Sequence, residues 1–325
     1  MFDDEKELDR RGFLHCMAWV GTAAVWTLSG GVLKGMPIEQ AVRRAAAKGR
    51  VPAGLQFVQI SDTHIGFNKP ANPDVTETLR AAIAKINAAS AAPEFVLHTG
   101  DLTHLSKPAE FDTLQQVLTE VKAPVFYVPG EHDILEDDGK SYLERFGKNT
   151  EGAGWHSFDH SGVHFIGLVN VVNLKAGGLG SLGAEQLAWL ERDVKHLKSS
   201  TPIVVFAHIP LWSIYPEWGW GTDDSAQALS YLKRFGSVSV LNGHIHQVMH
   251  KVEGHITFHT AMSTAFPQPT PGAAPSPGPM KVEADRLKKV LGIARVSFHD
   301  VRHPIAVTDV ALEEAGRAMA MPTRG

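Results

Sequence analysis

Residues 55–64 read LQFVQISDTH, a short apolar run that ends in a carboxylate and an imidazole two positions apart. Such a run is typical of a buried strand, and strand ends are where ligands bind in folds that combine strands with helices. The same arrangement recurs after the apolar runs 95–97, 125–128, 203–206 and 238–241. We therefore predict five buried strands that deliver five polar motifs to one edge of a sheet.

The polar residues after these runs have side chains that bind metal ions. They form the motifs D-T-H (62–64), G-D (100–101), G-E-H-D (130–133), A-H (207–208) and G-H-I-H (243–246). A lone D-x-H or G-D recurs in ordinary turns and caps, whereas two histidines at i and i+2 on one strand face have the spacing of metal ligands. Five such motifs, each after a predicted strand, predict a metal site that only the tertiary fold assembles.

Together the five motifs resemble the signature blocks of the calcineurin-like metallophosphoesterases, over about residues 56–258. The D-x-H form of the first block, and the lack of a G-D-x-x-Y tyrosine after Asp101, make the chain more similar to the cyclic-nucleotide phosphodiesterase branch than to purple acid phosphatases. The third block usually reads G-N-H-D or G-N-H-E, and Glu131 takes the place of the asparagine. The resemblance implies an α/β fold of two mixed β-sheets packed face to face with flanking helices, a four-layer αββα sandwich.

The resemblance also implies two transition-metal ions and assigns their ligands. The first ion is expected on Asp62, His64 and His246, the second on Glu131, His208 and His244, with Asp101 as the bridge. Carboxylates and imidazoles suit Fe, Mn or Zn and select poorly among them. Glu131 adds a negative charge that a trivalent iron would offset, so a mixed centre of iron and a divalent ion is expected.

The expected reaction is hydrolysis of a small phosphoester. By resemblance, a hydroxide that bridges the metals attacks phosphorus in line, His132 is the general acid for the leaving oxygen, and Asp133 orients His132. We predict a phosphodiesterase, with a phosphomonoesterase on the same site as the alternative; cyclic nucleotides, nucleotide diesters and phospholipids all remain open as substrates. A metal-free, non-catalytic interaction scaffold is the alternative from another class, and the near-complete ligand set disfavours it.

Residues 1–47 are predicted to be a targeting segment. Residues 9–14, DRRGFL, resemble a twin-arginine export signal, and the uncharged stretch 16–33 follows it. We expect the twin-arginine machinery to export the chain to the periplasm or the medium, with small residues at 45–47 available for cleavage, so that the mature chain is not an integral membrane protein. The alternative is a membrane anchor formed by uncleaved residues 16–33. Cys16 is the only cysteine, so residues 48–325 carry no disulfide and can fold in a reducing cytoplasm before transport.

The length and the single continuous set of motifs predict one domain over residues 48–325, which by resemblance is the phosphoesterase domain. The chain has 325 residues, 43% of them hydrophobic, and a net charge of -4, which gives no polybasic signature for nucleic acid. Helical patterns over 76–88, 109–121, 183–197 and 225–235 alternate with the predicted strands, and 155–158 with 163–169 read as a hairpin. This alternation is typical of an α/β sandwich.

Four further features leave alternatives open. The proline-rich residues 266–279 predict an extended surface loop. Residues 209–221 carry four large aromatic side chains, which either pack the loop onto the domain or form a wall that stacks on a base or an apolar leaving group. His98 and His104 flank the G-D motif, and the sequence does not decide whether they line the site. The histidines of an alternating segment are interpreted as strand residues rather than ligands; they are His250, His255 and His259.

Overall fold

The computed structural model describes residues 24–29, 32–37, 54–299 and 305–313. The chain divides into two units, residues 1–53 and 54–325. In the first unit, β1 (Ala24–Ser29) pairs antiparallel with β2 (Val32–Pro37). The arginine pair at 10–11 and the small residues at 45–47 lie outside the described residues. The export signal therefore stays a prediction.

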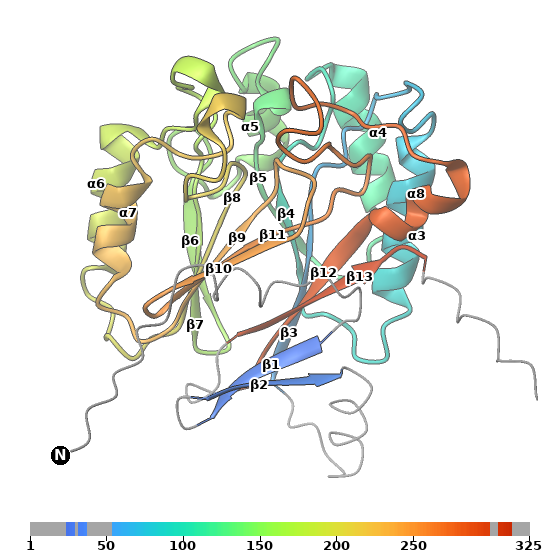
Figure 1. Cartoon of the computed structure of the whole chain (residues 1–325). Helices are drawn as coiled ribbons and strands as arrows, with labels where there is room; N and C mark the ends of the chain where they lie inside the picture. The colour runs from blue at the N-terminus through green and yellow to red at the C-terminus, as the bar shows by residue number, and fades with distance from the viewer. Residues whose placement is uncertain (1–23, 30–31, 38–53, 300–304, 314–325) are drawn as a thin grey trace, which may run out of the picture. The chain divides into compact units, whose positions relative to one another are not determined.

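The sheet that carries the first three motifs has five strands in the order β13-β12-β3-β4-β5 (Figure 1). Its strands are β3 (Leu55–Ile60), β4 (Val96–Thr99), β5 (Val125–Val128), β12 (Gly292–Phe298) and β13 (Ala306–Ala311). The first three run parallel, while β12 is antiparallel to β3 and β13 is antiparallel to β12. Because parallel strands end at the same edge, the loops after β3, β4 and β5 meet there.

The second sheet has six strands in the order β10-β11-β9-β8-β7-β6. Its strands are β6 (His156–His160), β7 (Val163–Gly167), β8 (Ile203–Ala207), β9 (Val238–Asn242), β10 (Met249–Glu253) and β11 (Ile256–Thr260). The inner four are parallel, and β6 and β10 are antiparallel edges. The hairpin of β6 and β7 confirms the predicted one, and both sheets are mixed as predicted.

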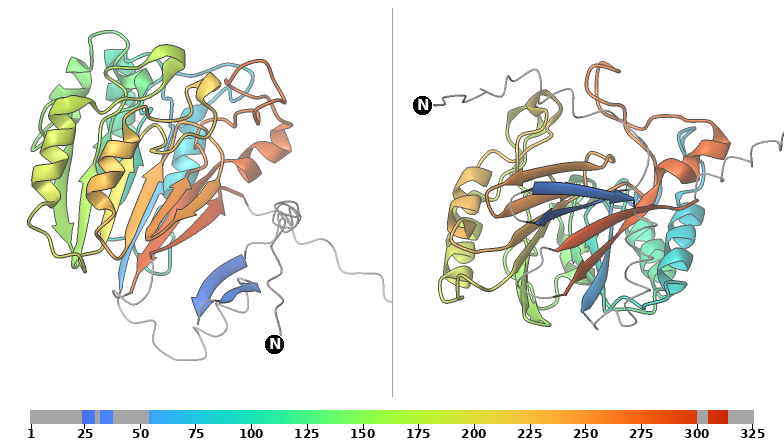
Figure 2. Two further views of the ribbon diagram at one scale, coloured as in Figure 1. Left: turned by 60° about the vertical axis from the view of Figure 1, so that its left-hand side comes forward. Right: turned by 60° about the horizontal axis from the view of Figure 1, so that its bottom comes forward.

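Helices cover the outer face of each sheet (Figures 1 and 2). On the first sheet lie α3 (Val75–Asn87), α4 (Pro108–Leu118), α5 (Lys140–Phe146) and α8 (Ala284–Val290); on the second lie α6 (Gly183–Val194) and α7 (Ser225–Leu232). Short 3-10 turns are η1 (Glu131–Asp133), η2 (Ala176–Gly178) and η3 (Pro216–Trp218). Among the described residues, none of the helices is long and apolar enough to cross a bilayer.

Alternation along β3 shows how the layers form. Val58 and Ile60 pack against the helices, while Leu55 and Phe57 pack between the sheets. Successive strand side chains point to opposite faces, so a strand buried on both faces reads as the nearly continuous apolar run of the sequence. Each such side chain contributes about 1.5–3 kcal/mol by leaving water. The predicted four-layer αββα sandwich is confirmed.

Helix starts were predicted better than helix ends. The start of α3 is one residue earlier than predicted, where Asp74 accepts a hydrogen bond from the backbone N–H of Glu77 (2.9 Å). At their ends α4, α6 and α7 stop three residues before the predicted limits of 121, 197 and 235. Val121, Leu197 and Phe235 still pack against the core after the helices have ended, so the apolar pattern continued beyond the helical backbone.

Candidate metal centre

All five motifs lie in the loops directly after β3, β4, β5, β8 and β9. Five of their residues have left-handed backbone, with φ between 41° and 70°: Asp62, His64, Asp101, His244 and His246. Non-glycine residues in this region are uncommon, cost of order 1–3 kcal/mol each and gather at functional sites. A Cβ at Gly130 would collide with the Asp101 carboxylate, and one at Gly243 with Ser61 and Asp62, so these turns require glycine.

The first group of side chains consists of Asp62, His64 and His246, all buried. Asp62 Oδ1 lies 3.2 Å from His246 Nε2, and His64 Nε2 lies 3.3 Å from His246 Nε2. Burial alone would raise the pKa of Asp62, but His246 and His208 lower that pKa to about 2. Asp62 is therefore ionised, as a metal ligand must be.

The second group consists of Glu131, His208 and His244. The Glu131 carboxylate spans the two histidines, with Oε2 at 2.9 Å from His208 Nε2 and Oε1 at 3.0 Å from His244 Nδ1. Burial opposes ionisation of Glu131, yet His244 and His208 hold its pKa well below the usual value. Glu131 therefore points into the cluster.

Asp101 lies between the two groups. Its Oδ2 is 3.5 Å from His64 Nε2 and 3.3 Å from His208 Nε2, so one oxygen faces both. Its Oδ1 accepts a hydrogen bond from the backbone N–H of His132 (3.0 Å). Burial would lower the pKa of His208, but Asp101 and Glu131 raise it well above the usual value, which means that this position favours positive charge.

The donor atoms are spaced as ligands of a shared metal ion would be, and several of them make no hydrogen bond to one another. Glu131 Oε2 and His208 Nε2 are close, yet neither makes a hydrogen bond of suitable angle, and both ring nitrogens of His244 are buried without one. Ligands about 2.0–2.2 Å from a shared ion are about 3.0–3.5 Å apart, which is the spacing of these atoms. The second ring nitrogens of His208 and His246 bond to the carbonyls of Thr99 (2.7 Å) and Phe266 (2.5 Å), an arrangement that aims Nε2 into the cluster.

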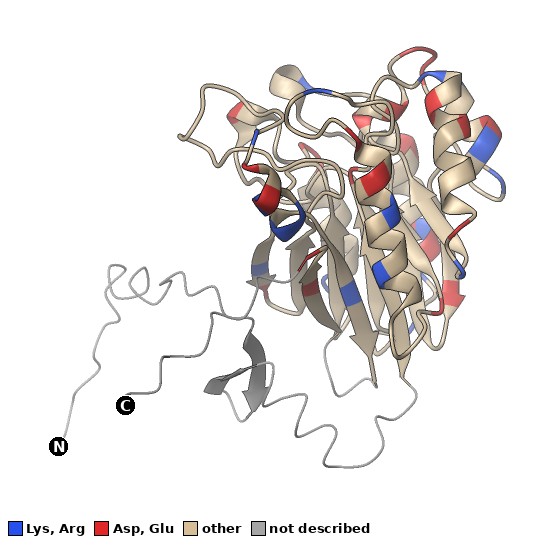
Figure 3. Cartoon of the chain, turned by 90° about the vertical axis from the view of Figure 1, so that its right-hand side faces the viewer, with Lys and Arg blue, Asp and Glu red and all other residues tan. Residues whose placement is uncertain are grey.

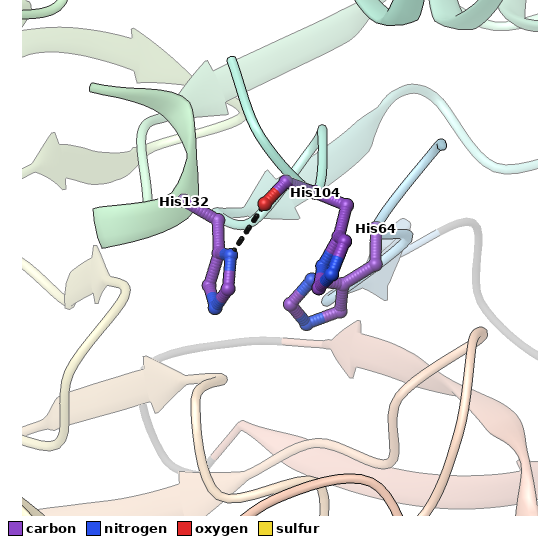
Figure 4. Close-up of side chains that lie close together, drawn as sticks. All are labelled: His64, His104 and His132. Carbon is purple, nitrogen blue, oxygen red and sulfur yellow. Dashed lines mark hydrogen bonds between the residues drawn. The ribbon is translucent and has the colours of Figure 1, made fainter. Parts of the chain in front are cut away.

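His132 lies at the rim of the cluster, in η1 (Figure 4). Its Nδ1–H donates to the carbonyl of His104 (2.6 Å), which leaves Nε2 as the nitrogen that can meet a substrate. The ring is 4.8 Å from that of His64, centroid to centroid. Burial lowers the pKa of His132, but Asp101 and Glu131 outweigh it and raise that pKa.

Asp133 does not orient the His132 ring, which corrects the prediction. Its buried carboxylate accepts hydrogen bonds from the backbone N–H groups of Gly130 (2.9 Å), Leu102 (3.0 Å) and Thr103 (2.8 Å). It therefore ties the G-D loop to the G-E-H-D loop. The carbonyl of His104 orients the ring instead, and because every residue has a carbonyl, the sequence carries no signal for it.

The two histidines beside the G-D motif have different places. The ring of His104 lies 5.1 Å from His132 and 5.6 Å from His64, so His104 lines the rim. His98 is buried behind the motif, where its Nε2 pairs with Thr63 Oγ1 (3.1 Å), and burial lowers its pKa to about 3. Only His104 is in a position to meet a ligand.

The structure also shows where the aromatic loop, residues 209–221, and the proline-rich loop, residues 266–279, lie. Trp212 and Trp220 are buried, and Trp212 packs 5.1 Å from Phe258, so packing explains these two, while Tyr215 and Trp218 are partly exposed. The proline-rich loop is not wholly a surface loop. Phe266 is buried, and its ring stacks on that of His64 with the centroids 4.7 Å apart. Its carbonyl bonds to His246 Nδ1, so the start of the loop belongs to the centre.

Three comparisons with known proteins bear on this arrangement. The chain matches the calcineurin-like phosphoesterase family over residues 55–248. A probable glycerophosphodiester phosphodiesterase of Arcobacter nitrofigilis is 26% identical over 162 residues, which are 47% of this chain and 57% of that protein. A 3′,5′-cyclic-nucleotide phosphodiesterase of a Nostoc species is 24% identical over 218 residues, 65% of this chain and 79% of that protein. The match thus spans little more than half the length of the first of these relatives.

Among solved structures, a dimetal phosphatase of Danio rerio has the same fold. It superposes with a TM-score of 0.61 over 80% of this chain and 97% of that one, at 14% sequence identity. This likeness concerns the fold. The family match covers more than half of the chain and includes all five motifs. The chain therefore belongs to the calcineurin-like phosphoesterases, a family of hydrolases that act on phosphoester bonds.

Proposed function

We propose that this chain is a binuclear phosphodiesterase for a small substrate. The observation that carries the proposal is the geometry of the centre: two groups of three donors face a single oxygen of Asp101, with His132 beside them. One ion would be held by Asp62, His64 and His246, and the other by Glu131, His208 and His244, with Asp101 shared. The three carboxylates, Asp101 included, and the four imidazoles around these positions suit Fe, Mn or Zn.

Two bound ions would neutralise phosphoryl oxygens and activate water for attack on phosphorus. The protein's own part is positioning and proton transfer. Carbonyls of Thr99 and Phe266 fix two ligand rings, and Asp133 holds the loops that carry Asp101 and His132 together. His132 Nε2 would deliver a proton to the leaving oxygen, and the raised pKa of this ring, caused by Asp101 and Glu131 against the effect of burial, favours the protonated form.

The choice of diesters over monoesters rests on the D-x-H first motif and on the activities for which two relatives are named. Two different phosphodiesterases, one for glycerophosphodiesters and one for cyclic nucleotides, resemble this chain. The intact donor set disfavours a metal-free scaffold. Lys and Arg are interspersed with Asp and Glu on the helices shown in Figure 3, which suits a small substrate rather than nucleic acid.

The test is a paired assay on metal-loaded protein with a nitrophenyl diester and the matching nitrophenyl monoester. We expect the diester to be hydrolysed with the higher kcat/KM, and we expect His208→Ala to abolish both activities. Preference for the monoester would overturn the phosphodiesterase proposal while leaving the metal centre in place. No turnover together with no bound metal would support the scaffold.

We also propose that the twin-arginine machinery exports the protein, with residues 1–47 as the signal. The support is the DRRGFL sequence at 9–14 followed by an uncharged stretch. Changing both arginines, Arg10→Lys and Arg11→Lys, should retain the protein in the cytoplasm, because the receptor recognises guanidinium groups rather than charge alone. Unchanged export of the double variant, measured by fractionation, would overturn this proposal, and retention in the membrane would favour an anchor.

A further inference from the structure

Two histidines and an aspartate meet at the edge where the two sheets come together. His250 and His259 are directly opposite each other on β10 and β11, and Asp309 comes from β13 of the other sheet. In Figure 2 the strands β10 and β11 lie beside β12 and β13. We call His250, His259 and Asp309 the edge triad. It shares no residue with the metal centre described above.

The separations within the edge triad do not match a simple hydrogen-bonded cluster. His259 Nε2 lies 3.0 Å from Asp309 Oδ1, but His250 Nε2 lies 3.7 Å from Asp309 Oδ2, which is too long for a hydrogen bond. The two imidazole rings are 4.6 Å apart, centroid to centroid. One donor atom from each residue lies within 4.8 Å of the other two, so a single ion can reach all three.

A second histidine site in the same domain shows what a proton-bound cluster looks like. His164 donates through Nδ1 to Asp159 (2.8 Å) and through Nε2 to Asp193 (2.9 Å), so one imidazolium satisfies two carboxylates. We call this arrangement the His164 bridge. The edge triad has the opposite ratio, with two imidazoles for one carboxylate. A set of two imidazoles and one carboxylate suits a divalent cation, which would supply the positive charge that a proton supplies in the His164 bridge.

The exposure of the edge triad allows an ion to enter. The His250 side chain is 56% exposed and that of Asp309 22%, whereas His259 is 3% exposed and fixed against the sheet. Two nitrogens and a carboxylate are ligands for Zn²⁺, Co²⁺, Ni²⁺ or Cu²⁺ rather than for Mg²⁺ or Ca²⁺, which prefer oxygen. Water would complete the coordination, as at other sites with three protein ligands.

We propose that the edge triad binds one divalent transition-metal ion, such as Zn²⁺, and that this ion joins β13 to β10 and β11. The ion would link two sheets that meet here without backbone pairing between β11 and β13. This site is separate from the proposed catalytic centre, and its occupancy does not depend on the activity of that centre.

The test is metal stoichiometry after stripping with a chelator and equilibrium dialysis against Zn²⁺. We expect His250→Ala to bind one ion per chain fewer than the wild type. His255→Ala is the matched control, because His255 is exposed on the turn between β10 and β11 and outside the triad; it should bind as many ions as the wild type. Equal stoichiometry in wild type and His250→Ala would overturn the proposal and leave a hydrogen-bonded cluster only.

A second measurement covers the case in which a variant folds poorly. Asp309→Asn keeps the shape of the side chain and removes the charge, and it should likewise lose one ion. Zn²⁺ should raise the Tm of the wild type and of His255→Ala by more than that of Asp309→Asn, because only the former two have an intact triad that binds the folded state. The same Tm increment in all three proteins would contradict the proposal. A Glu131→Ala protein that loses an ion from the catalytic centre should still bind the ion of the edge triad. The experiment therefore distinguishes failure of the edge-triad proposal from failure of the proposed catalytic centre.

Discussion

The metal centre and the edge triad use the same kinds of donor atom but are built in different ways. The centre takes its donors from loops at strand ends, with strained backbone at five of the seven positions. The edge triad takes its donors from regular strands that belong to two sheets. Loops at strand ends can be shaped for chemistry and opened to a substrate, whereas strand residues are held by pairing. This difference supports the catalytic role that we propose for the centre and the structural role that we propose for the triad.

The largest expected effect separates these roles. Asp101→Ala should lower turnover of a diester by more than about 10²-fold, since loss of even an outer-shell partner of a metal ligand costs about 10–100-fold. His250→Ala should leave kcat and KM unchanged. Steady-state kinetics on both metal-loaded variants measures the contrast. A large loss of kcat in His250→Ala would break the distinction between catalytic and structural sites.

Substitution of His132 tests whether this residue donates a proton to the leaving group. An alkoxide leaves only with a proton, whereas a nitrophenolate leaves without one. His132→Ala should therefore slow an alkyl diester by about 10²–10⁴-fold and a nitrophenyl diester much less. Parallel kcat measurements on the two substrates give the ratio. Equal losses would mean that His132 only binds phosphate.

Glu131 stands where the family usually has an asparagine, and its substitution tests whether this carboxylate binds metal. Its carboxylate lies against both His208 and His244, so Glu131→Asn should weaken metal retention in the centre. The loss of metal during timed dialysis against a chelator should be faster in Glu131→Asn than in Glu136→Gln, a change at a nearby exposed carboxylate. Identical retention in the two variants would remove Glu131 from the ligand set. The edge triad should keep its ion in both.

The smallest effect concerns the His164 bridge. Burial lowers the pKa of His164, but Asp193 and Asp159 outweigh it, so the folded pKa is raised above the unfolded value. The resulting stability is fully present below about pH 6.5 and is lost as the pH rises through the folded pKa. His164→Gln should flatten the dependence of the unfolding free energy on pH in that window, measured by urea denaturation. Unchanged pH dependence would show that the bridge carries no proton, and the contrast with the edge triad would lose its basis.

The donors could be placed at one edge from the sequence because the first donor of each motif follows its strand within three residues, so the order along the chain already indicates where these side chains lie. Asp62 after β3 and Asp101 after β4 are examples. The edge triad had no such signal. His250 and His259 were correctly placed in a strand segment and interpreted as non-ligands, since their partner Asp309 is distant in sequence and lies in the other sheet. Only the packing of the sheets brings them together.

Other differences have equally physical causes. The orientation of His132 by the carbonyl of His104, rather than by Asp133, depends on a backbone group that no residue type announces. Phe266 was assigned to a surface loop because prolines follow it, yet its own ring and carbonyl belong to the centre. His255, expected in a strand, lies on the turn between β10 and β11, where Gly254 adopts a positive φ of 60°.

We propose above all that Asp101 lies between two metal ions in this centre. The most direct measurement is an anomalous difference map from crystals of the metal-loaded protein, collected at the absorption edge of the bound metal. We predict two peaks that flank Asp101, one within ligand distance of Asp62, His64 and His246 and the other near Glu131, His208 and His244. A single peak, or none beside Asp101, would contradict the account.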